Sequence, residues 1–255
     1  MKIFDSHAHY NNPQFDEDRD YLLGEYLQEQ GVQYVMNAGA DIESSKAGVL
    51  LSEKYPFMYA SVGVHPHDVK SMTDESIQIL RELSKSKKVM SIGEIGLDYH
   101  YDYSPRDVQK HWFLEQLALA KEVDLPVMIH SREADQDTFD ILKSNNVENG
   151  VIHCYSGNKE LAREYVKRNF CIGIGGTLTF KNARKTVEVV EDIPLHNIVI
   201  ETDCPYLAPV PYRGKRNNSS YLTHVIEKIA EIKNITQEEV AQTTLENAKR
   251  LFRIN

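Results

Sequence analysis

Two histidines separated by a single residue stand near the start of the chain, in His7-Ala8-His9. Side chains alternate along a β-strand, so both imidazoles would point to the same side. Imidazole nitrogen is a good ligand for zinc, iron, nickel or manganese. Taken alone the pattern is weak, because strand histidines more often hydrogen-bond a neighbour than bind a metal ion.

Other residues that commonly bind metals also fall at the carboxyl ends of predicted strands. They are Glu94, His130, His153 and Asp203. Chance would rarely place ligand types so consistently at strand ends, where a parallel α/β barrel has its active site. The distribution therefore predicts a metal centre.

A carboxylate can bridge two cations, and this property suggests how the six ligands are divided. The first ion would be held by His7, His9 and Asp203, the second by His130 and His153, with Glu94 between them. Two ions about 3.5–4 Å apart can polarise a phosphoryl oxygen, activate water and stabilise the leaving oxygen. The expected cofactors are two divalent ions per chain, magnesium, manganese or zinc.

Catalytic roles are predicted for Asp203, Glu94 and His65. Asp203 would contact a metal ion and also accept a proton from the attacking water. His65 directly continues the third predicted strand, and histidine exchanges protons near neutral pH. We expect His65 to contact the substrate or its leaving group.

Two arginines are candidate phosphate contacts, because a guanidinium presents paired donors to phosphate oxygens. Arg132 lies two residues after His130, so both side chains can face the same mouth. Arg216 belongs to a short basic patch at residues 213–216. The expected substrate-binding residues are His65, Arg132 and Arg216.

Three tyrosines follow the fourth predicted strand at alternate positions, Tyr99, Tyr101 and Tyr103. Aromatic rings at this place could stack on bases or sugars. A half-buried structural cluster in the loop is the alternative, and the sequence leaves both open.

The elements that must position these residues are short β-branched runs alternating with amphipathic helices. Such alternation predicts a parallel sheet with covered faces. Eight strands favour a single (β/α)8 barrel of the TIM type, although periodicity does not remove a doubly wound open sheet. The predicted strands are residues 3–9, 34–40, 58–65, 89–98, 126–132, 151–155, 171–176 and 198–203. Among the predicted helices are residues 16–30, 74–86, 108–123 and 161–169, with two more helices in 221–252.

Size and composition fit one domain over residues 1–255, since about 250 residues is typical of this barrel. Three widely spaced cysteines favour a reduced, cytoplasmic protein. We find no signal peptide and no apolar run of the ~20 residues that would span a membrane. A net charge of −9 argues against a broad nucleic-acid-coating surface.

The motifs together resemble the TatD family of metal-dependent deoxyribonucleases, and the resemblance covers nearly the whole chain. The matching segments are residues 5–9, 63–67, 93–99, 129–132, 153–157 and 201–207. The resemblance implies a TIM-type barrel, a divalent metal centre and hydrolysis of phosphodiester bonds, often as a 3′-to-5′ exonuclease. The expected substrate is DNA, either single-stranded or with a free 3′ end. It also implies the six ligands given above and a substrate-contacting His65. One departure lies at residues 216–219, where relatives commonly continue with Glu and Pro.

Two other functions remain open from the sequence. The same centre could hydrolyse another substrate, such as an ester, lactone, amide or aminoacyl-tRNA, because fold and ligands do not decide the substrate. A barrel that keeps metal only for structure and binds nucleic acid or protein without catalysis is the second alternative. The intact ligand set disfavours it.

Overall fold

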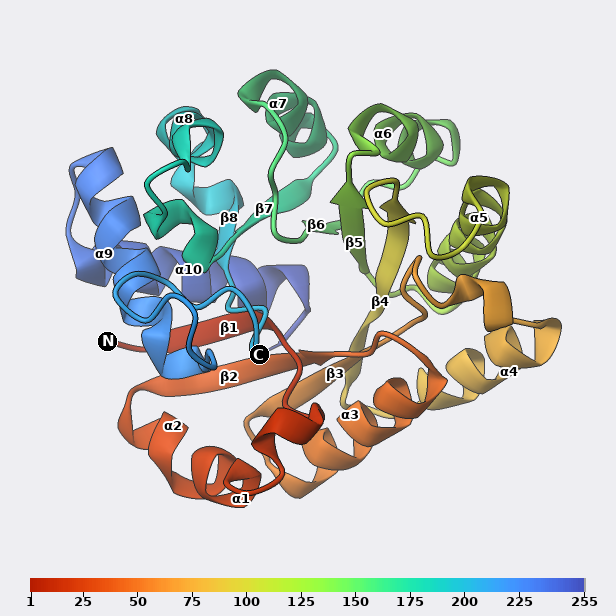
Figure 1. The fold of residues 1–255 in the computed structure, drawn as a ribbon, viewed down its shortest axis with the longest axis horizontal. Coiled ribbons are helices and arrows are strands. Elements are labelled where there is room, and N and C mark those ends of the chain that lie inside the picture. The colour runs from red at the N-terminus through yellow and green to blue at the C-terminus, as the bar shows by residue number, and fades with distance from the viewer. Residues whose placement is uncertain (255) are drawn as a thin grey trace.

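In a computed structural model that describes residues 1–254, eight parallel strands run in the order β1 to β8 around a barrel, with helices outside them (Figure 1). The (β/α)8 barrel predicted from the sequence is confirmed. The strands are β1 Ile3–Ala8, β2 Val32–Ala38, β3 Met58–Val62, β4 Val89–Asp98, β5 Val127–Arg132, β6 Gly150–Ile152, β7 Phe170–Ile174 and β8 Ile198–Ile200.

The barrel closes where the last strand meets the first. Ala8 forms a parallel bridge with Cys204, just beyond β8. The Ser6 hydroxyl donates a hydrogen bond to the Ile200 carbonyl over 3.0 Å. These contacts bring residues near 7 and near 203 together, although almost 200 positions separate them in the chain.

Ten α-helices surround the barrel in the described residues. They are α1 Arg19–Tyr21, α2 Leu27–Glu29, α3 Ile42–Lys54, α4 Asp74–Leu83, α5 Arg106–Glu122, α6 Asp135–Ser144, α7 Lys159–Lys167, α8 Arg184–Asp192, α9 Leu222–Lys233 and α10 Gln237–Leu251. Helices α4, α5 and α7 begin and end within three residues of the predicted bounds, while α9 and α10 are the two helices expected in residues 221–252. The helix expected over residues 16–30 is divided, because a π-helical turn at Leu22–Tyr26 separates α1 from α2.

Helix α10 covers the amino-terminal end of the barrel. Its residues Leu245 and Ala248 join a buried apolar cluster with inward-facing strand residues such as Phe4 and Met36. Phe252, directly after the helix, places its ring 5.9 Å from that of Phe4. This end is therefore filled with apolar side chains, and polar groups lie at the opposite end.

Several strands end earlier than the sequence predicted. β6 stops at Ile152 and β8 at Ile200, so His153 and Asp203 lie in the segments that follow. Cys154 and Asp203 have positive φ angles of 44° and 54°, which turn the chain out of extended geometry.

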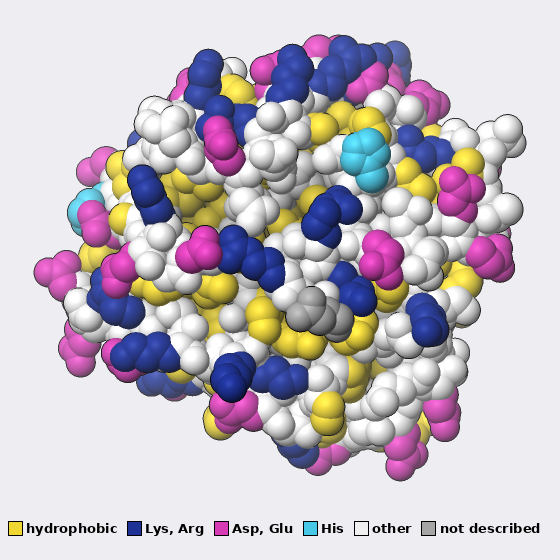
Figure 2. All heavy atoms as spheres, turned by 180° about the vertical axis from the view of Figure 1, so that it is seen from behind, with side chains coloured by type: hydrophobic (Ala, Val, Ile, Leu, Met, Phe, Trp, Pro, Cys, Tyr) yellow, Lys and Arg dark blue, Asp and Glu magenta, His cyan; other side chains and the backbone are white. Residues whose placement is uncertain are grey.

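On the face seen from behind the view of Figure 1, Lys and Arg side chains lie both near the centre and around the margin, whereas most Asp and Glu side chains lie toward the margin (Figure 2). In the described part of the chain, no helix combines the length and apolar character needed to cross a bilayer.

Candidate metal centre

The six predicted ligands converge at the carboxyl end of the barrel. His7 and His130 lie within β1 and β5, His9 and His153 follow directly after β1 and β6, and Asp203 lies three residues after the end of β8. Glu94 differs from the prediction, since it lies inside β4 and not at its end. The pairing register of β4 with β5 shifts between Ile92 and Ile95, and Glu94 lies within this irregular stretch.

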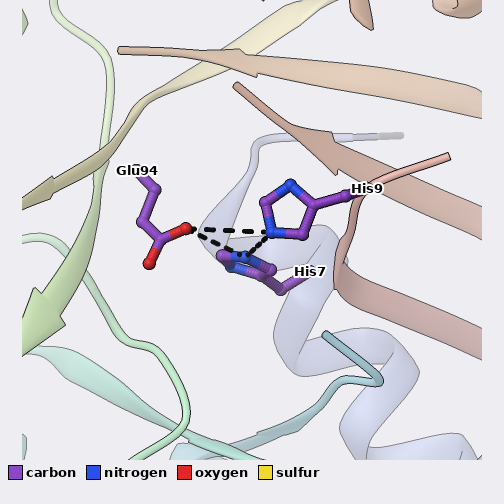
Figure 3. A group of neighbouring side chains, drawn as sticks. All are labelled: His7, His9 and Glu94. Carbon is purple, nitrogen blue, oxygen red and sulfur yellow. Dashed lines mark hydrogen bonds and ion pairs between the residues drawn. The ribbon is translucent and has the colours of Figure 1, made fainter. Parts of the chain in front are cut away.

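The two carboxylate oxygens of Glu94 face different histidines. Oε2 lies 3.4 Å from Nε2 of His7 and 3.8 Å from Nε2 of His9. Figure 3 shows both rings pointing at this one oxygen. Oε1 lies 2.8 Å from Nδ1 of His130 and 3.0 Å from Nε2 of His153. Glu94 therefore stands between two groups of imidazoles.

Asp203 completes the group around Oε2 of Glu94. Its Oδ1 lies 3.3 Å from Nε2 of His9 and 3.7 Å from Nε2 of His7. The two imidazole nitrogens are themselves 3.0 Å apart. The backbone N–H of Asp203 donates to the His7 carbonyl over 2.9 Å, which fixes the carboxylate beside β1.

His65 joins the group around Oε1, with its Nε2 3.4 Å from that oxygen. Burial lowers the pKa of His65 to about 4, and the neighbouring His130 adds to this effect. The ring is therefore neutral at pH 7. One nitrogen of the neutral ring can donate a hydrogen bond and the other can accept one, but the ring carries no charge to a phosphate.

Buried carboxylates in this cluster remain ionised. Burial alone would raise the pKa of Glu94, but His153, His65 and His7 hold it well below its ordinary value. Burial likewise opposes ionisation of Asp203, and the hydrogen bond from His9 helps to keep its pKa low. The same contacts hold protons on several imidazoles, which metal binding would displace.

Two further carboxylates, which the sequence reasoning missed, support the histidines from behind. Asp98 is fully buried, and its Oδ2 lies 3.1 Å from Nε2 of His130 and 2.9 Å from Nε2 of His67. Glu201 is 1% exposed, with Oε1 3.3 Å from Nδ1 of His153. Strand alternation could have found both, because Asp98 shares the parity of Glu94 and Glu201 that of Asp203.

The donor set fits divalent cations. Among the described residues, three groups of three side chains could each hold an ion, because the ligand atoms within a group lie within 4.8 Å of one another. The groups are His7, His9 and Glu94; His65, Glu94 and His130; and His7, His153 and Glu201. In the described structure, Nδ1 of His7, Nδ1 of His153 and Oε2 of Glu201 are buried without a hydrogen-bond partner. Imidazole and carboxylate together suit zinc or manganese, and carboxylate also suits magnesium.

A pocket of about 620 Å³ opens over the cluster. Beyond the ligands, its walls include Asn11, Asp41, His67, Tyr101, Arg132 and Tyr206. Arg132 thus faces the same mouth as His130, as the spacing predicted.

Arg216 is placed outside the lining of this pocket. Its guanidinium pairs with Asp18 (Nη1 to Oδ1, 2.8 Å) and donates to the Gln14 carbonyl over 2.6 Å. The segment after Arg216 also forms hydrogen bonds within the protein, because the Asn217 amide donates to the carbonyls of Thr202 and Tyr206.

Comparison with known proteins gives a consistent result. The sequence pattern of the family described as "TatD related DNase" matches residues 4–253. An uncharacterized metal-dependent hydrolase of Bacillus subtilis, YabD, is 49% identical, covering 99% of this chain and 100% of its own length. The 3′-5′ ssDNA/RNA exonuclease TatD of Cronobacter sakazakii is 33% identical and covers 98% of this chain and 97% of its own.

Solved structures show the same architecture. The TatD homologue YjjV of Escherichia coli superposes with a TM-score of 0.93 at 32% identity, over 99% of this chain and 98% of its own. A phosphotriesterase homology protein of Escherichia coli, complexed with phosphate, gives a TM-score of 0.73 over 98% of both chains. At 15% identity this second likeness shows the fold alone.

Proposed function

Because this chain belongs to the TatD-related DNase family of metal-dependent hydrolases, we propose that it cleaves phosphodiester bonds of DNA from the 3′ end of a single strand. The observation that carries the proposal is the position of Glu94, whose two oxygens face two separate sets of imidazoles. A bridging carboxylate of this kind suits a pair of cations acting on one phosphate.

Each residue of the centre receives a role in this proposal. His7, His9 and Asp203 would hold one ion, His130 and His153 the other, and Glu94 both. Bound divalent ions would supply Lewis acidity toward a phosphoryl oxygen and toward water.

Asp203 is the proposed general base. Its carboxylate is ionised, because its pKa is lowered, and it lies at the pocket wall, where water can reach it and transfer a proton to it. His65, neutral at pH 7, would donate a hydrogen bond to the phosphate or the leaving oxygen. Arg132 would neutralise a phosphate oxygen at the rim. Because Arg216 is committed to Asp18, we assign the phosphate contact to Arg132 alone.

The name of the Cronobacter sakazakii relative supports a single-stranded substrate and attack from the 3′ end, and it includes RNA as well as DNA. Three unpaired cysteines support a reducing compartment such as the cytoplasm.

A metal-dependent substrate panel tests the proposal. The purified chain is assayed with magnesium, manganese or zinc against 5′-labelled single-stranded DNA, RNA, aminoacyl-tRNA and small esters. We expect metal-dependent shortening of the DNA from its 3′ end. Strong ester or aminoacyl-tRNA turnover with untouched DNA would reject the nuclease assignment.

The role of Asp203 is tested in the same assay with Asp203→Asn. Loss of the base should reduce turnover by about 10²–10⁴-fold. Asp140→Asn, on the exposed surface of α6, is the matched control and should retain wild-type turnover. Wild-type rates in Asp203→Asn would remove it from the mechanism.

A further inference from the structure

Exposed aromatic rings stand at one wall of the pocket, where β4 ends. Tyr103 is 56% exposed and Tyr101 is 44% exposed. Their rings stack with centroids 5.1 Å apart and planes 20° apart. Tyr101 also lines the pocket.

A cation lies against the same rings. The Arg132 guanidinium is 4.8 Å from the centroid of Tyr101. Among the described pocket-lining residues, Arg132 is the only Lys or Arg, and no carboxylate oxygen of the described chain lies within ion-pair distance of it. The Arg132 guanidinium therefore rests against an aromatic ring and forms no ion pair with the residues that the structure describes, which leaves its N–H groups available to a phosphate.

The loop that carries the rings is held firmly by buried polar side chains. The Gln109 amide, on α5, donates to the carbonyls of Asp98 and Ser104 over 3.0 and 2.8 Å. The Ser104 hydroxyl donates to the His67 carbonyl over 2.8 Å. The His67 ring in turn lies edge-on to Tyr103, with centroids 4.8 Å apart. These hydrogen bonds anchor the backbone of the loop, and packing against His67 and Tyr101 restricts the Tyr103 ring although it faces solvent.

We propose that Arg132, Tyr101 and Tyr103 form a stacking platform for a nucleobase next to the phosphate that enters the metal centre. The inference rests on the proposed function and specifies the substrate as a single strand, whose unpaired bases are free to stack. Every base presents a π-face, so the platform would bind without strong sequence preference. Rings fixed before binding lose little conformational entropy when a base stacks on them.

The test compares binding of two single-stranded oligonucleotides that differ only by one base. Both carry phosphorothioate linkages that resist cleavage, and one has an abasic 3′-terminal nucleotide. Dissociation constants are measured by fluorescence anisotropy with the metal present. We expect the wild-type chain to bind the strand with the base about tenfold more tightly.

Variants of Tyr103 then separate stacking from other effects. Tyr103→Ala should bring the ratio of the two dissociation constants close to one, and Tyr103→Phe, which keeps the ring, should preserve it. Tyr21→Ala is the matched control, because Tyr21 is also 56% exposed but lies on α1.

An unchanged ratio in Tyr103→Ala would overturn the platform, as would a wild-type chain that binds both strands equally or neither. Because the readout is affinity, it does not depend on turnover. Failure of the proposed function would be seen separately, as unmodified DNA left uncut in the presence of metal.

Discussion

Each of two proposed ligand histidines, His153 and His130, has a second carboxylate beside it. Glu201 lies beside Nδ1 of His153, whose Nε2 faces Glu94. Asp98 lies beside Nε2 of His130, whose Nδ1 faces the same oxygen of Glu94. Such carboxylates fix the tautomer and direction of a metal-binding imidazole.

Glu201 is therefore predicted to be a positioning residue. Glu201→Gln should weaken metal affinity by about 10–100-fold, because His153 loses the negative charge that lies beside its Nδ1. Isothermal titration calorimetry measures the affinity, and circular dichroism checks that the variant is folded. Glu227→Gln, on the exposed face of α9, serves as control. Unchanged metal affinity in folded Glu201→Gln would contradict the assignment.

Arg216 provides a prediction that depends on pH. Its hydrogen bonds hold the pKa of Asp18 below the ordinary value of 3.8. A carboxyl with a lowered pKa in the folded state stabilises the fold above its unfolded pKa, and this stabilisation is lost as the pH falls through the folded value.

Arg216→Gln should accordingly reduce the free energy of unfolding at pH 7 by up to about 1 kcal/mol, as expected for a partly exposed pair. The difference from wild type should shrink as the pH falls below about 4. Urea denaturation at several pH values measures it. A large loss of DNA affinity in this variant with unchanged stability would instead favour a substrate contact.

At the scale of elements, the barrel separates an apolar end from a polar one. Helix α10 and the residue after it fill the amino-terminal end, where Phe252 is 1% exposed and packs near Phe4. The proposed metal ligands occupy the other end. Packing and metal binding should therefore respond to different substitutions.

Phe252→Ala should lower the free energy of unfolding by about 3–5 kcal/mol, because it leaves a cavity in a buried cluster. Metal affinity of the folded variant should stay at the wild-type value. Arg253→Ala, which removes exposed hydrogen bonds to the carboxylate and the carbonyl of Asp124, should cost much less. If denaturation shows that both variants lose the same free energy of unfolding, the residue after α10 does not stabilise the barrel by apolar packing.

Much of this architecture was predictable from the sequence, for identifiable reasons. Alternation in a strand placed His7 and His9 on one side, and the order of eight strands predicted the barrel. The strand ends were less predictable, since Cys154 and Asp203 turn the chain through positive φ without the usual glycine.

The placement of Glu94 inside β4 depends on a register shift that involves β5, and the pairing of Arg216 with Asp18 joins residues 198 positions apart. Both features arise from tertiary contacts, which spacing within one segment does not encode.

At the scale of the whole molecule, a chain with net charge −9 concentrates ionised carboxylates in one buried cluster. Divalent ions bound there would offset this charge and link residues of five strands or strand ends. Metal binding should therefore stabilise the entire barrel.

Removal of metal with a chelator should lower the melting temperature, and its return should restore it. An ion at 100 times its dissociation constant stabilises the folded state by about 2.7 kcal/mol. Differential scanning calorimetry measures the shift. An identical melting temperature with and without magnesium, manganese and zinc would argue against a cluster built for cations.

Anomalous diffraction from crystals soaked in manganese would show whether Glu94 lies between two bound ions. We expect two ions per chain on either side of Glu94, about 3.5–4 Å apart. The ligands of one should be His7, His9 and Asp203, and those of the other His130 and His153. Crystals soaked in saturating manganese that show no ion on one or both sides of Glu94 would contradict this arrangement.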